Sequence, residues 1–469
     1  MGRTINDLYF LLSVQSVALG SWSLFKGIAL GVGMTLLAAL VPAIEATTAS
    51  PRSALQRASL EAGTRAWLPT LAVLGVAAML LAAVLIGLGG GLLPAFAGLF
   101  LIILGWALLV PGLLVGLIAL LTPLLGRVTG ATGRMAARGI RAGLSRTGMA
   151  TASLAVAMSA VIGVAVMVDS FRHTFSIWLD ATLQADVYIS ADGGLQPEQV
   201  QRLRSAAGVL DSSTGRNVDV PVDGRRTRLR VFDLPDHRST GFRFLGATAE
   251  QAVQRFMAGE GVFVTEPWAW HHAVTTGDSI ALATPLGERR LPVLGIVQDY
   301  SRSAGAVVAH RRLYDRDWDD PRVDSVAVHL HADTDGRDWI GQQQALAASD
   351  DGAPLVFRFN REIRRLSLAV FDQTFTITQV LRWLATLVAL VGVTSALMAL
   401  SLERQREHAL LRAIGLLPSE LWRLVSIQNV LLGACAAVLA LPLGLVLAAV
   451  LTLVINQRSF GWTMALRLD

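Results

Sequence analysis

Long apolar blocks alternate with polar links along the chain, and one extended polar region interrupts them. A helix that crosses the hydrocarbon core of a bilayer needs about 20 mostly apolar residues. By that measure the pattern predicts about six membrane spans. They cover residues 27–44, 68–88, 92–125, 149–168, 380–402 and 424–455. The alternative, a bundle of core helices in a soluble protein, poorly explains the third block, which carries no charged residue.

The polar region, residues 171–372, has the pattern of a folded globular domain. Short runs of alternating or continuous apolar residues, bounded by Gly, Pro or Asp, are typical of β-strands. They occur at residues 186–190, 262–265, 279–283, 291–297, 325–329 and 355–359. Helical periodicity appears at 197–207 and 248–258. The fold class we predict is therefore an α-helical transmembrane bundle of about six spans with an inserted extracytoplasmic α+β domain.

Arginines predict which side of the membrane each link occupies. Three of the short links between spans are rich in arginine, whereas the turn at residues 87–93 has none. The arginines are Arg52, Arg57 and Arg65 in the first link, Arg127, Arg134, Arg138, Arg141 and Arg146 in the second, and Arg404, Arg406, Arg412 and Arg423 in the third. Because cytoplasmic loops carry an excess of positive charge, these links are expected in the cytoplasm. The inserted domain then lies outside.

Composition supports a membrane protein and argues against an ATPase. Of the 469 residues 53% are apolar and only 16% are charged, against about 25% charged in typical soluble domains. The one lysine, Lys26, lies between Phe25 and Gly27. A phosphate-binding loop of the Walker type ends in Gly-Lys-Ser/Thr, so this chain has none. We therefore expect no enzyme activity in the chain itself.

The candidate chemical sites are weak. His329 and His331 lie two apart on a predicted strand and could both face a metal ion, but an exposed strand face explains them as well. A run of aspartates, with no EF-hand spacing, is typical of a solvated acidic turn: Asp315, Asp317, Asp319 and Asp320. The single cysteine, Cys435, has no partner for an internal disulfide. The formal net charge is +5, and because the arginines flank apolar blocks, membrane topology explains it better than nucleic-acid binding. We predict no catalytic, cofactor or metal site.

The third arginine-rich link, residues 403–423, combines ion-pair spacing with an apolar helical face. Ala409, Leu410, Ala413, Ile414 and Leu417 share that face. Gly415 can stop the helix, and Pro418 can begin the next one. The segment is therefore expected to form a short amphipathic helix at the inner membrane surface. It could dock into a groove of a cytoplasmic ATPase or simply reverse the chain direction, and the residues alone leave both open.

The run from Glu403 to Gly415, Glu-Arg-Gln-Arg-Glu-His-Ala-Leu-Leu-Arg-Ala-Ile-Gly, resembles the signature of the FtsX-like ABC permease family. His408 departs from it at a position that is more often apolar. The polar region resembles the MacB-type periplasmic core domain, and residues 361–402 look like that family's stalk helix. The resemblance implies that the link is the ATPase-coupling helix. Its implied residues are Glu403, Arg404, Glu407, Leu410, Leu411, Arg412, Ile414 and Gly415, the apolar ones for docking and the charged ones for positioning.

The resemblance also implies a domain order. Residues 1–50 would end a first FtsX-like unit and include one span, and 51–147 would hold two linker spans with arginine-rich loops. Residues 148–170 would be a transmembrane helix, 171–372 the extracytoplasmic α+β domain, and 373–469 the FtsX-like permease domain with coupling helix 403–417 and its last span missing. The chain would then be a fragment of a ten-span permease with two units.

The resemblance implies a function as the membrane subunit of a bacterial ABC transporter. It would couple ATP hydrolysis on a separate ATPase to motion of the external domain and export or extract a lipid-like, lipoprotein or hydrophobic cargo. The alternatives are an FtsX-type signalling or scaffold protein without a substrate, and a membrane-anchored binding domain without an ATPase. Expected partners are a cytoplasmic ABC ATPase, a second permease copy or homologue and membrane lipids. The expected location is the bacterial inner membrane.

Overall fold

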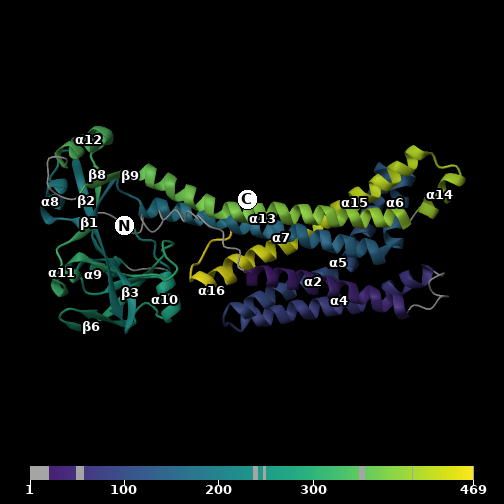
Figure 1. Cartoon of the computed structure of the whole chain (residues 1–469), viewed down its shortest axis with the longest axis horizontal. Helices are drawn as coiled ribbons and strands as arrows, with labels where there is room; N and C mark the ends of the chain where they lie inside the picture. The colour runs from purple at the N-terminus through teal and green to yellow at the C-terminus, as the bar shows by residue number, and fades with distance from the viewer. Residues whose placement is uncertain are drawn as a thin grey trace. The chain divides into compact units, whose positions relative to one another are not determined.

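The computed structural model describes residues 21–48, 57–235, 241–246, 250–347, 354–403 and 405–467. The described residues form two compact units (Figure 1). Of the described residues, the first contains 164–381 and those from 448 onward, and the second contains 21–163 together with 382–447. Two long helices contribute residues to both units: α7, Leu144–Thr182, and α13, Asn360–Glu403.

The second unit is entirely helical in its described part. Besides parts of α7 and α13, it contains six further described helices. They are α2 (Ser21–Thr48), α4 (Arg57–Gly87), α5 (Leu92–Val128), α6 (Gly130–Ala142), α14 (Gln405–Ala413) and most of α15 (Pro418–Ala449). The chain continues from α15 through a π-helix, η1 (Val450–Ile455), into α16 (Asn456–Phe460).

Small residues let the helices of this unit approach closely. A Cβ atom placed on Gly75 of α4 would lie 2.7 Å from the carbonyl oxygen of Gly105 on α5, and the two helices lie side by side (Figure 1). Close approach of backbones at small residues is how membrane helices gain packing energy without a hydrophobic effect between them. Elsewhere, the indole Nε1 of Trp106 donates to the carbonyl oxygen of Leu439 over 3.1 Å, which joins α5 to α15.

The predicted spans agree with the helices of the described part of the chain. Five helices there are long and apolar enough to cross a membrane. They cover Ala66–Gly87, Leu92–Val128, Leu144–Thr182, Asn360–Gly392 and Pro418–Phe460. The remaining block, residues 27–44, lies within α2, whose described apolar stretch, Leu24–Leu36, is shorter than these five helices. The structure thus confirms an α-helical transmembrane bundle, with five of the candidate spans in the described part of the chain.

Between α7 and α13 the chain folds into an α+β domain, as the sequence predicts. Its strands are β1 (Val187–Leu195), β2 (Val209–Val222), β3 (Arg225–Asp233), β4 (Val262–Thr265), β5 (Ser279–Thr284), β6 (Gly287–Val297), β7 (Val307–His310), β8 (Val323–Leu330) and β9 (Leu355–Phe359). Its helices are α8 (Pro197–Arg204), α9 (Glu250–Met257), α10 (Glu266–His272), α11 (Arg311–Asp317) and α12 (Gly336–Ala347). All six predicted strands and both predicted helices are present. The sequence analysis missed β2, β3, β7 and three of the helices.

One continuous sheet organises this domain into two lobes. The strand order is β3-β7-β4-β6-β5-β2-β8-β1-β9, and β3 also pairs with β2, so six strands close into a ring. The long strand β2 belongs to both lobes, because its beginning pairs with β8 and its end pairs with β3. A core around Trp268 fills the ring, and a second core around Trp339 lies under α8 and α12.

Candidate functional site

The predicted coupling segment forms a helix, a tight turn and the start of a second helix. α14 ends at Ala413, and Gly415 follows with φ +105°. The amide of Gly415 donates to the carbonyl oxygen of Arg412 over 3.1 Å. The amide of Leu416 donates to the carbonyl oxygen of Leu411 over 3.0 Å. This pair of bonds is the Schellman motif, which needs a left-handed residue and favours glycine. Gly415 is therefore the helix stop that the sequence indicates.

The next helix begins with its own cap. Pro418 is the first residue of α15, and the amide of Leu417 donates to Oε2 of Glu420 over 3.0 Å. Leu417 therefore lies at the start of α15 and not on the face of α14, which corrects the expected extent of the coupling helix, 403–417. The left-handed turn at Gly415 is the reason, because it ends the helical repeat that the apolar spacing suggested.

Large apolar side chains project from this hairpin into solvent. We use the name hairpin knobs for Leu410, Ile414, Leu417 and Trp422, all of which are exposed. Leu411 is half-buried, and Glu407 and Arg412 are exposed. Glu403 is the last residue of α13, and Arg404 lies outside the described residues. Exposed apolar patches with polar rims are typical of surfaces that bind a protein or a membrane. The hairpin knobs are therefore a candidate binding surface.

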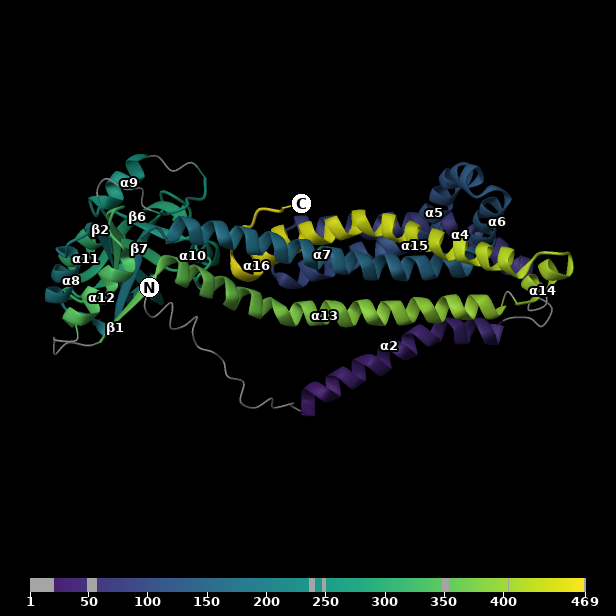
Figure 2. The same cartoon turned by 90° about the horizontal axis from the view of Figure 1, so that it is seen from above.

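The other unit contains a stalk, which we define as residues 171–182 of α7 and 360–375 of α13. Both helices extend from the α+β domain (Figure 2). Two ion pairs join them, Arg172 to Asp372 and Arg364 to Asp180, each with an Nε–Oδ1 distance of 2.8 Å. These side chains are about half exposed, and such pairs contribute only about 0–1 kcal/mol each. The ion pairs therefore align the two helices more than they stabilise them.

An aromatic cluster supplies the stronger contact in the stalk. Phe371 packs against three other rings, with centroid distances of 5.0, 5.2 and 4.6 Å. Those rings belong to Phe171, Phe175 and Phe375. Aromatic pairs contribute about 0.5–1.5 kcal/mol beyond their buried area. The stretch Phe371–Phe375, which the sequence analysis assigned to a stalk helix, therefore forms the packed core of that stalk.

A segment after α16, residues 461–467, is fastened to both the stalk and the α+β domain. The ring of Trp462 lies 5.8 Å from Phe171 and 5.7 Å from Tyr300. The amide of Thr463 donates to Oε1 of Glu266 over 2.9 Å, and the hydroxyl of Tyr300 donates to the carbonyl of Thr463 over 2.7 Å. We call residues 461–467 the strap. Sequence reasoning did not find it, because its partners are far away along the chain.

Glu266 is the titratable group at the strap. Its side chain is buried, and burial raises the pKa of its carboxyl, an effect that the hydrogen bond from Thr463 opposes. Its Oε2 atom is buried and has no hydrogen-bond partner among the described residues. Only one oxygen of this buried carboxyl accepts a hydrogen bond, so ionising the group in place costs free energy. The strength of the contact between Glu266 and the strap therefore depends on whether the carboxyl is protonated.

The weak candidate sites have ordinary structural roles. His329 is buried on β8, whereas His331 lies beyond the end of that strand. Within the described ranges, no group of three or more His, Cys, Asp or Glu side chains is placed to hold a metal ion. In the acidic turn, Asp320 accepts from Arg216 and from the hydroxyl of Tyr314. Asp320 and its neighbours therefore form ion pairs that tie α11 to β2.

Comparison with known proteins agrees with the membrane architecture. Residues 380–468 match a family described as FtsX-like permease C-terminal. The chain is also similar to the "Uncharacterized ABC transporter permease protein Rv0987" of Mycobacterium tuberculosis, with 36% identity over 481 residues. That alignment covers 100% of this chain and 56% of the relative, so the chain spans little more than half of the relative's length.

Two solved structures show limited similarity to the chain. The periplasmic region of MacB from Actinobacillus actinomycetemcomitans has a TM-score of 0.31 and 11% identity, and covers 40% of this chain and 94% of that one. The extracellular domain of the noncanonic ABC-type transporter YknZ from Gram-positive bacteria has a TM-score of 0.27 and 11% identity, with coverage of 37% and 98%. With these similarities and its candidate spans, the chain is a multi-pass membrane protein that resembles a bacterial ABC transporter permease along its whole length and matches the FtsX-like permease C-terminal family at residues 380–468.

Proposed function

We propose that the chain is the membrane subunit of an ABC transporter in which a separate cytoplasmic ATPase drives motion of the α+β domain outside the membrane. The hairpin knobs are the observation that carries this proposal. Three of them lie between two candidate spans and Trp422 lies near the start of the second span, on the link whose arginines predict a cytoplasmic position. A folded hairpin that exposes four large apolar side chains favours a covering surface, and we propose that a groove of the ATPase supplies it.

Helix continuity supports transmission of motion through the chain. α13 runs without a break from Asn360, next to the last strand of the α+β domain, to Glu403, just before α14. A long hydrogen-bonded helix transmits displacement along its axis because its backbone has few soft degrees of freedom. Movement of the hairpin by an ATPase would therefore be carried along α13 toward the stalk and its domain.

The cargo we propose is lipid-like, a lipoprotein or another hydrophobic molecule. Charged side chains within spans usually mark ion or proton pathways, and the sequence from 68 to 125 contains none. Such spans suit lateral extraction from the bilayer better than an aqueous channel. The most apolar stretch of α13, beyond the packed part of the stalk, has no buried residue among those described, so a second permease copy or homologue could pack against it. A signalling scaffold of the FtsX type uses the same mechanics and remains the alternative.

Replacing Ile414 by Asp tests the docking role. Burial of an Ile or Leu side chain contributes about 1.5–3 kcal/mol, and a carboxylate in the same groove would also lose its hydration. We expect Ile414→Asp to lower stimulation of the partner ATPase at least tenfold, measured in proteoliposomes that contain both subunits. Leu286→Asp is the matched control, because Leu286 is 80% exposed and Ile414 is 77% exposed, and Leu286 lies in the α+β domain.

The two variants separate docking from folding. If Ile414→Asp inserts at the normal level and still stimulates the ATPase like the unmodified chain, the hairpin is not the coupling element. If Leu286→Asp reduces stimulation equally, loss of an exposed apolar residue acts by a general effect and the docking proposal fails.

A further inference from the structure

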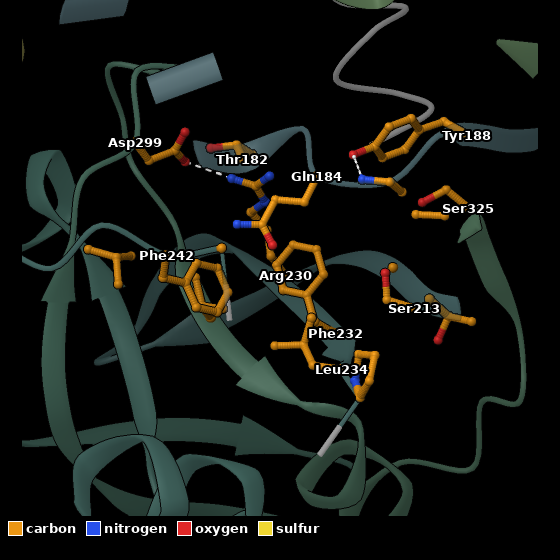
Figure 3. Close-up of a pocket in the computed structure, with 18 of the residues that line it drawn as sticks. Thr182, Gln184, Tyr188, Ser213, Arg230, Phe232, Leu234, Phe242, Asp299 and Ser325 are labelled. Atoms are coloured by element: carbon orange, nitrogen blue, oxygen red, sulfur yellow. Dashed lines mark hydrogen bonds and ion pairs between the residues drawn. The ribbon is translucent and has the colours of Figure 1, made fainter. Parts of the chain in front are cut away.

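A cavity of about 100 Å³ lies in the α+β domain, apart from the hairpin, and nothing in the proposed coupling uses it (Figure 3). β2, β3 and β8 line it, together with the chain that follows α7. Trp178, Phe232 and Phe242 supply apolar walls, and Gln184, Ser213 and Ser325 supply polar ones. Apolar cavities of this order, about 150 Å³, hold a benzene ring. The space therefore suits one small group and not a whole lipid.

A buried arginine lies at the centre of this cavity. Arg230 projects from β3, and its side chain is only 11% exposed. Its Nη1 donates to Oδ2 of Asp299 over 2.7 Å (Figure 3). Within the part of the chain that the structure describes, its buried Nε has no hydrogen-bond partner. A buried donor without a partner costs about 1–3 kcal/mol, so the guanidinium group has unused capacity to bind an acceptor.

In Asp299, in contrast, both carboxylate oxygens already accept hydrogen bonds. Its side chain is 6% exposed, Oδ2 accepts from Arg230, and Oδ1 accepts from the amide of Ser301 over 2.9 Å. Arg230 is thus held in place by a fixed carboxylate on one side. A second carboxylate could approach its remaining donors, because the planar guanidinium group binds carboxylates through more than one edge.

We propose that this cavity binds a small carboxylate that carries an aromatic or branched apolar group. The anionic end would accept hydrogen bonds from Arg230, and the apolar end would pack against Phe232, Phe242 and Trp178. The carboxylate could belong to a free organic acid or to the C-terminus of a peptide, since both present the same chemistry.

The same cavity contacts the stalk. Trp178 belongs to α7, lines the cavity and lies 5.9 Å from Tyr300, ring centroid to centroid. Tyr300 follows Asp299 directly and donates to Thr463 of the strap. A ligand that displaces Trp178 or reorients Asp299 therefore acts on residues that hold the stalk and the strap together.

Ligand-observed NMR on the purified chain in detergent tests the site, with benzoate as the probe and benzamide as its neutral analogue. We expect benzoate to bind and benzamide to bind at least tenfold more weakly. Arg230→Gln should weaken benzoate binding at least tenfold. Asp299→Asn should strengthen it, because it removes the carboxylate that competes for Arg230. Arg228→Gln is the matched control, since Arg228 lies on the same strand as Arg230, pairs with Asp219 of β2 and does not line the cavity.

Opposite effects of the Arg230 and Asp299 substitutions separate a binding site from a structural ion pair. If both weaken benzoate binding, or if benzamide binds as well as benzoate, the proposal is wrong. If Arg230→Gln fails to fold, the Asp299→Asn result decides: a gain supports the site and a loss overturns it. Peptides ending in phenylalanine, with free or amidated carboxyl groups, distinguish the two sources. Tighter binding of the free peptide acid than of benzoate identifies a peptide terminus, and weaker binding identifies a small acid. None of these measurements requires the ATPase.

Discussion

At the scale of single residues, the strap contact depends on one buried carboxyl. Because burial raises the pKa of Glu266, the attached state binds a proton more readily than a detached state in which Glu266 is hydrated. Linkage then requires that rising pH favours detachment. The effect begins above the ordinary glutamate pKa and is complete above the raised one. The strap should therefore be most firmly attached in acid.

Glu266→Gln should remove this pH dependence. Glutamine keeps an oxygen that can accept from Thr463 but cannot ionise. At neutral pH we expect slower hydrogen exchange in residues 461–467 of the variant than in the unmodified chain, with the difference shrinking toward acid. Mass spectrometry of the exchanged peptides measures it. Comparing both proteins at each pH cancels the effects of other groups beside the strap, such as His173, whose Nδ1 lies 2.9 Å from Nη1 of Arg467. Equal exchange of both proteins at neutral pH would contradict the role of Glu266.

The sequence alone could not reveal the strap contact, because the residues that form it are far apart along the chain. Glu266 and Thr463 are separated by 197 positions, and neither belongs to a motif. Arg230 and Asp299 are equally anonymous, because an arginine on a strand is more often a solvated residue than a buried one. Gly415, by contrast, was predictable, since a glycine at the end of an apolar helical repeat reports a local backbone requirement.

At the scale of elements, the strands divide into those with a visible pattern and those without one. The six predicted strands have apolar runs between turn residues, and all are present. β2 was not predicted because its sequence contains Asp, Ser, Gly and Asn, which are uncommon in strands, and Pro221 near its end. Its Arg216 forms ion pairs instead, with Asp324 on the neighbouring strand β8 and with Asp320 just before that strand. β7, with four buried residues, is too short for its period to be read.

The hairpin turn gives the element-scale prediction. A Cβ atom would meet nothing within 4 Å at either Gly415 or Gly433, but Gly415 has φ +105° and Gly433 lies inside α15. Only the backbone conformation differs, so Gly415→Ala should cost about 1–2 kcal/mol. Gly433→Ala should be neutral or stabilising by up to about 1 kcal/mol.

Hydrogen exchange in residues 405–420 measures this difference. We expect roughly tenfold faster exchange in Gly415→Ala, since each 1.4 kcal/mol corresponds to about a factor of ten. Gly433→Ala should leave the exchange of this segment unchanged. Unchanged exchange in Gly415→Ala would mean that the Schellman turn contributes little to the hairpin.

At the scale of the whole molecule, the hydrophobic pattern and the arginine distribution carry the proposed function. Helices of sufficient length and apolar content are present, and the arginine-rich links predict that α14 and the α+β domain face opposite sides of the bilayer. This sidedness is necessary for coupling, because an ATPase on one side can drive an external domain only through helices that cross between them.

Cysteine labelling tests the sidedness directly. Cys435 is the only cysteine and is buried, so Cys435→Ser gives a background without thiols. In that background, Leu346→Cys on α12 and Glu407→Cys on α14 introduce exposed thiols. A maleimide that does not cross membranes should label Leu346→Cys in intact cells and Glu407→Cys only after permeabilisation. Labelling of both variants in intact cells would place the hairpin and the domain on the same side. An ATPase in the cytoplasm could not then reach the hairpin, and the coupling mechanism would have to be abandoned.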